Sequence, residues 1–202
     1  MRLLLDSDVF CKLSIGGVLV DAVSVLGGDL SDCRRLPALP HMLRKGSLRR
    51  AYGQEACDAV IPVAERISAI EPPDISWLDK LTQIPAIDAG EAQLFAAVAE
   101  TGGFIATGDK RALRALREIA GFPEALAGRV VVCEAILLVL CEHLGTEIVR
   151  QRMQPILASD TVIRICFSPG NSDPRSCLVS YYRNLVAELA PLTLWSPLSE
   201  GD

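Results

Sequence analysis

The sequence contains few of the residues and motifs on which several common catalytic sites depend. Its 202 residues include only two histidines, His41 and His143, which leaves little for catalysis by imidazole. The seven cysteines are scattered, and none stand at the close spacing of a zinc knuckle or a redox pair. A phosphate-cradling glycine loop, a nucleophile elbow and a histidine metal motif are also missing. We interpret the cysteines as buried free thiols in a reducing cytosol, and the histidines as ordinary surface or half-buried residues.

Positive charge is also scarce. The formal net charge is -5 and the sequence pI is about 5.1. This balance excludes a protein that coats nucleic acid through a general positive field. It does not exclude a nucleic-acid substrate, because a site built from acids is locally negative until a metal ion is bound.

Long apolar runs are absent as well. The most apolar stretches, residues 15–28 and 130–144, contain charged residues and are shorter than the ~20 residues that span a bilayer. At the N-terminus, Asp6 interrupts the apolar segment before it reaches the length of an export signal. We therefore expect a cytoplasmic protein with no membrane partner. A hydrophobic content of 50% in a chain of this length predicts one domain with one substantial core.

Two short apolar segments of the chain each end on an acid. Residues 2–5 suit a buried strand and are followed by Asp6-Ser7-Asp8, and residues 103–107 form a second such segment followed by Asp109. A helical pattern follows each acid, which predicts the strand and helix units of an α/β fold. In a parallel sheet the ligand site lies beyond the carboxyl ends of the strands, so Asp6 and Asp109 are expected at one edge. We predict a three-layer α/β fold with a mainly parallel central sheet flanked by helices.

A third acid opens the helix that precedes the second of these strands. Glu91 lies three and four residues before Leu94 and Phe95, so it belongs to the stripe that should face the core. One interpretation is a capping box, with Asp88 as the N-cap and Glu91 reaching back to its backbone. The other is a metal ligand at the top of the buried face. Asp109, considered alone, is also explained as an N-cap.

The other expected elements follow from apolar spacing and from turn residues. Gly16-Gly17 weakens or bends the first helix, Pro62 breaks or kinks the third, and Pro37 and Pro40 restrict the second strand to a short or edge position. The expected strands are residues 33–40, 128–133 and 161–167, and the expected helices are residues 9–26, 41–52, 54–70, 77–81, 110–120, 134–153 and 175–189.

The most basic part of the chain is the helical stretch that contains Arg44, Lys45 and Arg49. It is explained either as a solvated helix face or as a rim that contacts phosphates near the acids. On the second interpretation these three residues and Lys110 bind nucleic acid.

Several carboxylates at one sheet edge cannot all ionise without cations. Hard oxygen ligands favour magnesium or manganese, and such ions bind phosphate oxygens and activate water. The acids therefore predict a Mg²⁺ or Mn²⁺ site suited to phosphodiester hydrolysis.

At this point the chain resembles the PIN domain, a family of metal-dependent nucleases that act mainly on RNA and include the toxins of toxin–antitoxin pairs. The resemblance covers residues 1–135 and lies in the order and spacing of three short motifs: LLLDSDVF at residues 3–10, DAGEA at 88–92 and ATGDKR at 106–111.

The resemblance implies that Asp6, Glu91 and Asp109 are catalytic metal ligands. It adds Asp88 and Asp8 as nearby acids, Asp88 as a further ligand, and Ser7 or Thr107 as polar supports. It implies a ribonuclease that uses Mg²⁺ or Mn²⁺, with RNA as substrate and an antitoxin protein as the partner of a toxin.

The chain departs from the family pattern at one position. Many members carry a further glutamate on the helix after the second strand, where residues 40–45 contain no acid, and Glu55 comes more than two turns later. This leaves a second hypothesis open, a catalytically inactive PIN-like module that binds a protein or RNA partner. We assign residues 1–156 to the PIN-like domain and residues 157–202 to a C-terminal strand and helix extension packed on it, which could serve dimerisation or partner binding.

Overall fold

The centre of the protein is a five-stranded sheet in which every strand runs parallel to its neighbours. The computed structural model describes residues 2–198; residues 1 and 199–202, at the ends of the two predicted regions, lie outside the described residues. From one edge to the other the strands are β3 (Ser68–Ala69), β2 (Cys33–Arg35), β1 (Leu3–Leu5), β4 (Phe104–Thr107) and β5 (Val130–Val132). The predicted α/β fold with a parallel central sheet is confirmed.

The central strand is β1, and its position follows from its composition. Leu3, Leu4 and Leu5 are all buried, as expected for a parallel strand covered on both faces. Beyond the strand, the backbone N–H of Asp6 donates to the carbonyl of Ala106 at 3.0 Å. The carboxyl ends of β1 and β4 are therefore in register, and the acid that follows each strand lies at the same edge of the sheet.

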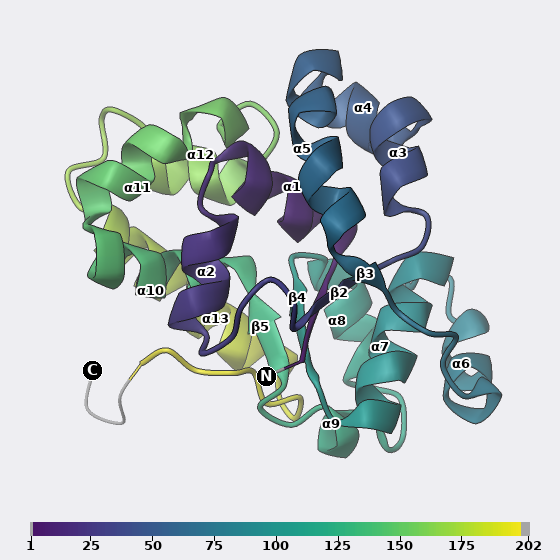
Figure 1. Cartoon of the computed structure of the whole chain (residues 1–202). Coiled ribbons are helices and arrows are strands. Elements are labelled where there is room, and N and C mark those ends of the chain that lie inside the picture. Colours follow the sequence, from purple (N-terminus) through teal and green to yellow (C-terminus); the bar gives the residue numbers. More distant parts are fainter. Residues whose placement is uncertain (1, 199–202) are drawn as a thin grey trace.

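Helices lie on both sides of the strands and beyond their carboxyl ends (Figure 1). The helices of the first half are α1 (Ser7–Ile15), α2 (Leu19–Val25), α3 (Leu39–Lys45), α4 (Ser47–Tyr52), α5 (Gln54–Arg66) and α6 (Ile75–Thr82). The helices of the second half are α7 (Ala89–Thr101), α8 (Lys110–Leu116), α9 (Phe122–Ala125), α10 (Cys133–Leu144), α11 (Thr146–Arg152), the 3₁₀ helix η1 (Gln154–Ile156), α12 (Thr161–Phe167) and α13 (Pro174–Leu189).

Glycine divides three of the predicted helices. The expected helix at residues 41–52 is two helices, α3 and α4, that meet at Gly46. The expected helix at residues 9–26 is two helices, α1 and α2, separated at Gly16 and Gly17, and Gly17 has a φ of 65°. The expected helix at residues 134–153 is likewise divided into α10 and α11 at Gly145, which has a φ of 91°. Glycine adopts such positive φ angles without steric cost, and it thereby ends one helix and redirects the chain into the next.

Three other expectations need correction. Residues 161–167 form the helix α12, not a strand: the Asp160 side chain caps it by accepting from the N–H of Ile163, and the β-branched residues that suggested a strand lie on a helix that buries Ile163, Cys166 and Phe167. Strand β2 is short as predicted but lies between β1 and β3, because Pro37 comes after it and takes no place in its ladder. Pro62 lies inside a continuous α5, and the two-residue strand β3 that follows was not predicted.

The C-terminal helices pack onto the sheet's own helices. Helix α13 contacts α8, α10 and α12, and Leu194 beyond it pairs with Val130 of β5. The cores on the two sides of the sheet are filled by large side chains, among them Phe10, Phe95 and Phe167. Among residues 2–198, no helix is long and apolar enough to cross a membrane.

Candidate functional site

The two acids predicted at the strand ends lie where the sheet topology places them. Asp6 follows β1 and Asp109 follows β4, and each is the N-cap residue of the next helix. Asp109 performs the capping role, since its Oδ1 accepts from the N–H of Ala112 at 2.9 Å. Asp6 makes no such side-chain cap bond. The capping interpretation therefore explains part of Asp109 and none of the Asp6 carboxylate.

Glu91 occupies the third predicted position and is 7% exposed. It forms a complete capping box with Asp88: the N–H of Glu91 donates to Asp88 Oδ1 and the N–H of Asp88 donates to Glu91 Oε2, both at 2.8 Å. Gly90 lets this first turn of α7 approach the chain after β2, because a Cβ there would lie 2.8 Å from Leu36 Cδ1. The box holds one oxygen of Glu91 and fixes its direction.

Electrostatic interactions connect two of the three acids Asp6, Glu91 and Asp109, here called the acidic triad: Glu91 interacts with Asp109, whereas the charge that acts on Asp6 is that of Asp8. Burial, together with the neighbouring Asp109 carboxylate within hydrogen-bonding reach, raises the pKa of Glu91 to about 8. Burial and the charge of Asp8 raise the pKa of Asp6 to about 6. Thr107 links the members, since its Oγ1 donates to Asp6 Oδ2 and accepts from the N–H of Asp109, both at 3.3 Å. Too little positive charge stands beside these groups for all to ionise at neutral pH.

A cavity of about 610 Å³ opens beside the triad. Asp6, Glu91 and Asp88 line it on the side of the acids, and the chain between β2 and α3 forms another wall. Its dimensions are within the range of small-molecule sites. Two members of the triad, Asp6 and Glu91, therefore line a space that a ligand can enter, and Asp109 does not.

Met42 of α3 lines the same cavity and belongs to residues 40–45, the stretch in which the sequence has no acid. Its sulfur lies 4.0 Å from the Oγ of the buried Ser7. This wall of the cavity thus carries a half-buried thioether, which has no charge.

In their present rotamers, the three side chains of the triad do not form a complete metal-coordination site. Within residues 2–198, no three histidine, cysteine, aspartate or glutamate side chains are arranged around one point so that they could hold a metal ion. The donor chemistry nevertheless suits a hard divalent cation: Asp6 and Glu91 are carboxylates with raised pKa values that line one cavity, and a cation would stabilise their ionised forms. The nearest cationic side chain on Asp109 is the exposed Arg111, at 4.0 Å.

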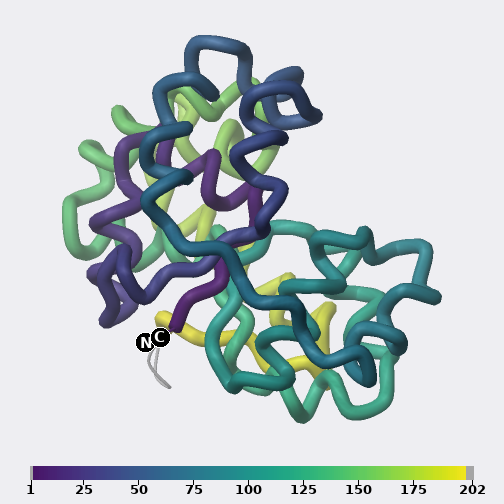
Figure 2. Tube along the Cα trace, turned by 45° about the vertical axis from the view of Figure 1, so that its right-hand side comes forward, coloured from purple at the N-terminus to yellow at the C-terminus, as the bar shows by residue number. Residues whose placement is uncertain are grey.

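A second group of acids at this edge forms ion pairs with lysine side chains of the protein itself. Lys12 of α1 is 6% exposed, and its Nζ lies 2.5 Å from Asp8 Oδ2 and 2.5 Å from Asp160 Oδ2. The hydroxyl of Tyr52 donates to the other oxygen of Asp8 at 2.5 Å. Although burial disfavours the ammonium form, Cys133 and the two carboxylates raise the pKa of Lys12. Figures 1 and 2 show the segment at residue 160 beside α1, so the C-terminal extension contributes to this edge.

Glu134 at the start of α10 is the third member of this group. It is 4% exposed, and its Oε1 lies 2.7 Å from the Nζ of Lys110. Lys110 also stands over the ring of Tyr181, 5.9 Å from the centroid. We call Asp8, Asp160 and Glu134 the lysine-paired acids. Lys110, predicted to bind nucleic acid, is thereby engaged with Glu134.

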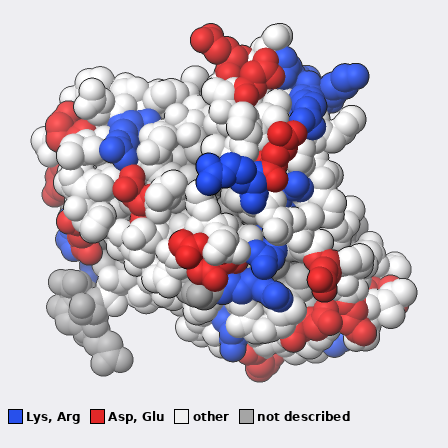
Figure 3. Space-filling view, in the orientation of Figure 1, with Lys and Arg blue, Asp and Glu red and all other residues white. Residues whose placement is uncertain are grey.

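The predicted basic rim is partly neutralised. Arg44 pairs with Glu65 of α5, and both Nη atoms of Arg49 contact Asp58, at 2.6 and 3.2 Å. Lys45 is exposed, and no ion pair is found for it among the described residues. On the face shown in Figure 3, Lys and Arg atoms are interspersed with Asp and Glu atoms over α3 to α5. The rim is thus mainly the solvated helix face of the first interpretation.

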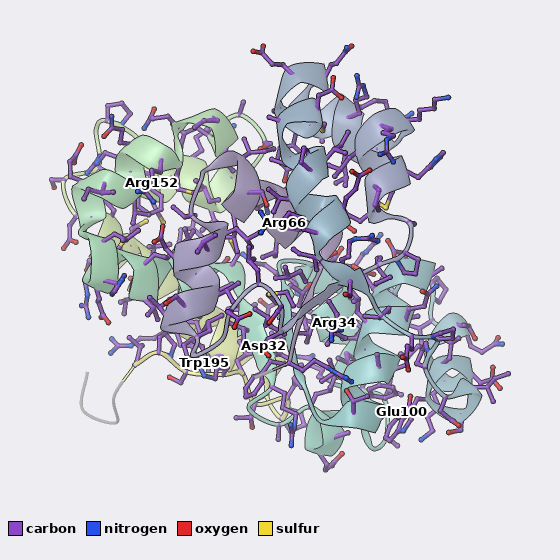
Figure 4. All side chains as sticks on the ribbon, viewed as in Figure 1. Asp32, Arg34, Arg66, Glu100, Arg152 and Trp195 are labelled. Atoms are coloured by element: carbon purple, nitrogen blue, oxygen red, sulfur yellow. The ribbon has the colours of Figure 1, made fainter. Side chains whose placement is uncertain are left out.

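A second cavity, of about 310 Å³, lies away from the acidic triad. Arg2, Arg34 and Glu100 line it, between the edge strands and the end of α7 (Figure 4). The Arg34 guanidinium is engaged with the carbonyls of Ser31 and Cys33, and Glu100 accepts from the N–H of Asp74. This cavity shares none of its lining with the triad.

Sequence patterns singled out Asp8 but missed the other two lysine-paired acids, Asp160 and Glu134, together with Tyr52 and Met42. Lys12 alone carried a signal: it falls on the apolar stripe of α1 between Val9 and Leu13, and a buried lysine needs acidic partners. The sequence predicts Glu134 as an ordinary helix start and Asp160 as the residue before an expected strand; the lysines that pair with them are distant in sequence.

No protein-family model, curated protein or solved structure matches this chain. A function must therefore be inferred from the chemistry of the acids and from the order of the motifs that contain them.

Proposed function

We propose that the protein is a metal-dependent endoribonuclease that hydrolyses RNA phosphodiester bonds at the acidic triad. The observation that supports this most directly is the contrast in counter-ions at one sheet edge. Asp8, Asp160 and Glu134 each have a lysine within 2.7 Å, whereas Asp6 and Glu91 have raised pKa values beside further carboxylates. A Mg²⁺ or Mn²⁺ ion supplies the missing charge.

The residues have distinct parts in this proposal. Asp6, Glu91 and Asp109 would hold the ion, and closing the set requires an adjustment of their side chains. Asp88 fixes Glu91 through the capping box, and Thr107 orients Asp6 relative to the backbone of Asp109. When bound, the ion supplies Lewis acidity toward a phosphate oxygen and lowers the pKa of a bound water.

RNA is the proposed substrate, in a cytoplasmic protein. Its backbone would reach the triad through the cavity lined by Asp6, Asp88 and Glu91. Lys45 is the basic side chain best able to contact a phosphate, since Arg44, Arg49 and Lys110 would first have to leave their acidic partners. We therefore expect recognition to rely on the metal more than on a positive surface.

The test is cleavage of an end-labelled single-stranded RNA by purified protein with Mn²⁺ or Mg²⁺. Asp6→Asn and Asp109→Asn should each lower the rate by about a thousandfold, since removing a ligand from a catalytic ion costs several kcal/mol of transition-state stabilisation. Asp79→Asn, an exposed position on α6, is the matched control and should cleave at the wild-type rate. Near-normal cleavage by either triad variant, with the fold intact by circular dichroism, would overturn the mechanism.

The uncharged side chain of Met42 and the incomplete ligand set favour a second candidate, an inactive PIN-like module that binds a protein or RNA partner. The two candidate functions differ in their requirement for a metal ion. The enzyme requires it for turnover, whereas the binding module should hold its partner in the presence of a chelator. Pull-down of partners with EDTA and with Mn²⁺ tests this difference.

A toxin role, with an antitoxin protein as partner, rests on the resemblance of the three motifs alone. A homodimer formed through residues 157–202 is a further hypothesis, made because these residues lie outside the resemblance. A small antitoxin-like reading frame beside this gene would support the toxin role, and a solitary gene would count against it.

A further inference from the structure

The C-terminal helices bring two cysteines together. Cys166 of α12 and Cys177 of α13 have their sulfur atoms 2.8 Å apart. Both are thiols in this structure. A disulfide needs an S–S separation near 2.05 Å, so joining them requires only a small side-chain movement.

The chain between α12 and α13 holds this pair in place. The Arg150 guanidinium of α11 donates to the carbonyls of Ser168 and Asn171, both at 2.8 Å. The Asn171 side-chain amide donates to the carbonyl of Cys166, also at 2.8 Å. The connection is thus bonded to its own helix and to a neighbouring one, and the closeness of the sulfurs follows from this packing.

The two thiols differ in access to solvent. Cys166 is fully buried, and burial and its neighbour Cys177 raise its pKa. Cys177 is half-buried, so a small oxidant can reach it. The other five cysteines are all buried. An accessible thiol beside a buried one is the arrangement in which oxidation of the first is followed by attack from the second.

We propose that Cys166 and Cys177 are a modification site that forms a reversible disulfide on exposure to a hydroperoxide. The inference does not depend on the proposed nuclease function.

The chemistry balances in two steps. The Cys177 sulfur attacks the peroxide, the O–O bond breaks, and the products are a sulfenic acid on Cys177 and an alcohol, or water where the oxidant is hydrogen peroxide. The Cys166 sulfur then attacks the Cys177 sulfur, the S–O bond breaks, and the hydroxyl leaves as water with the Cys166 proton. Two thiols are oxidised and one peroxide is reduced. A thiol reductant reverses the bond by exchange.

The disulfide would stabilise the part of the extension that reaches the acidic edge. Cys166 lies on the helix whose N-cap, Asp160, holds Lys12, and Cys177 lies on the helix that packs against α10. A bond between them closes a short loop and restricts the unfolded chain. We expect the melting temperature to rise by about 5 °C on oxidation.

The experiment treats the reduced full-length protein with hydrogen peroxide, alkylates the remaining thiols and maps tryptic peptides by mass spectrometry. Cleavage after Arg164, Arg175 and Arg183 places the two cysteines on separate peptides. The expected product is peptide 165–175 joined to peptide 176–183, lost on treatment with dithiothreitol. Recovery of both cysteines alkylated, or of Cys177 as a sulfinic acid with no linked peptide, would overturn the proposal.

Variants test whether the thermal shift comes from this bond. Cys177→Ser should give neither the linked peptide nor the higher melting temperature. Cys141→Ser, at a buried cysteine of α10, is the matched control and should keep both. A peroxide-induced shift of equal size in Cys177→Ser would count against the proposed bond.

Discussion

The acidic triad and the lysine-paired acids share one edge of one sheet, yet their environments differ in a single respect. Both groups are buried or half-buried carboxylates. Lys12 and Lys110 neutralise the paired group at 2.5 to 2.7 Å, whereas the triad has no lysine within such a distance among the described residues. Where the chain supplies its own cation, the acids join helices; where it does not, a proton or the proposed metal ion would neutralise them.

Asp6 and Asp8 show the same difference within one turn. The two residues are separated only by Ser7, and both are half-buried. The oxygens of Asp8 are occupied by the cation Lys12 and by Tyr52. Asp6 accepts a hydrogen bond from Thr107, and the backbone N–H groups of the next two residues also stabilise its carboxylate. It has no ion pair among the described residues, and its pKa is raised. Asp8 is therefore a structural residue and Asp6 the candidate ligand, a distinction that side-chain type and spacing do not reveal.

The largest expected effect on stability comes from removing the internal cation. Lys12→Met leaves Asp8 and Asp160 close together without a partner and should lower the free energy of unfolding by about 3 kcal/mol. Urea denaturation measures this. Lys45→Met, at an exposed position on α3, should change it by less than about 0.5 kcal/mol. Equal stability of both variants would mean that Lys12 is not what holds these acids together.

Raising the pH should lower the stability of the metal-free protein through the triad. Because the pKa of Glu91 is raised from 4.5 to about 8, the metal-free folded protein keeps a proton that the unfolded chain has lost. This contribution to stability is complete at low pH and disappears as the pH rises through about 8.

In Glu91→Gln, the free energy of unfolding should therefore fall less between about pH 5 and about pH 8 than it does in the wild type. Relative to the variant, the metal-free wild type should lose about 1–2 kcal/mol over this range. Urea unfolding at both pH values in EDTA gives the comparison. Parallel curves for the two proteins would show that Glu91 is ionised as in water and is not crowded by Asp109.

The smallest expected effect is a gain. Met42→Glu places a carboxylate beside the cavity that Asp6 and Glu91 line, and should strengthen Mn²⁺ binding by about tenfold, because affinity for hard cations follows the number of charged ligands. Met42→Gln is the uncharged control of similar size. If both variants bind Mn²⁺ equally well, the side chain at position 42 does not reach the ion.

Much of the fold was predictable because its signals are local. Apolar strands that end on acids gave β1 and β4, and Asp88 and Asp109 marked the starts of α7 and α8. The errors arose where tertiary context decided. The β-branched residues of α12 satisfy a strand pattern, but their neighbours bury a helical face. The strand β3 has only two residues, too few for any periodicity, and pairing with β2 alone defines it.

In the candidate site, too, residues with local signals could be predicted and residues placed by tertiary packing could not. Asp6, Glu91 and Asp109 were predictable because each stands at the end of its own element, and the parallel topology brings such ends together. Lys12 and Asp160 are 148 residues apart in sequence, and Tyr52 reaches Asp8 across 44 residues. Only the packing of the C-terminal helices and of α4 onto α1 reveals which acids are already neutralised.

The most direct test of the central claim is calorimetric titration of Mn²⁺ into the metal-free protein, with Asp6→Asn and Asp8→Asn beside the wild type. Saturable binding should occur in the wild type, be lost in Asp6→Asn and persist in Asp8→Asn, whose carboxylate is engaged by Lys12. No binding to the wild type, or equal loss in both variants, would contradict the assignment of the uncompensated acids as the metal site.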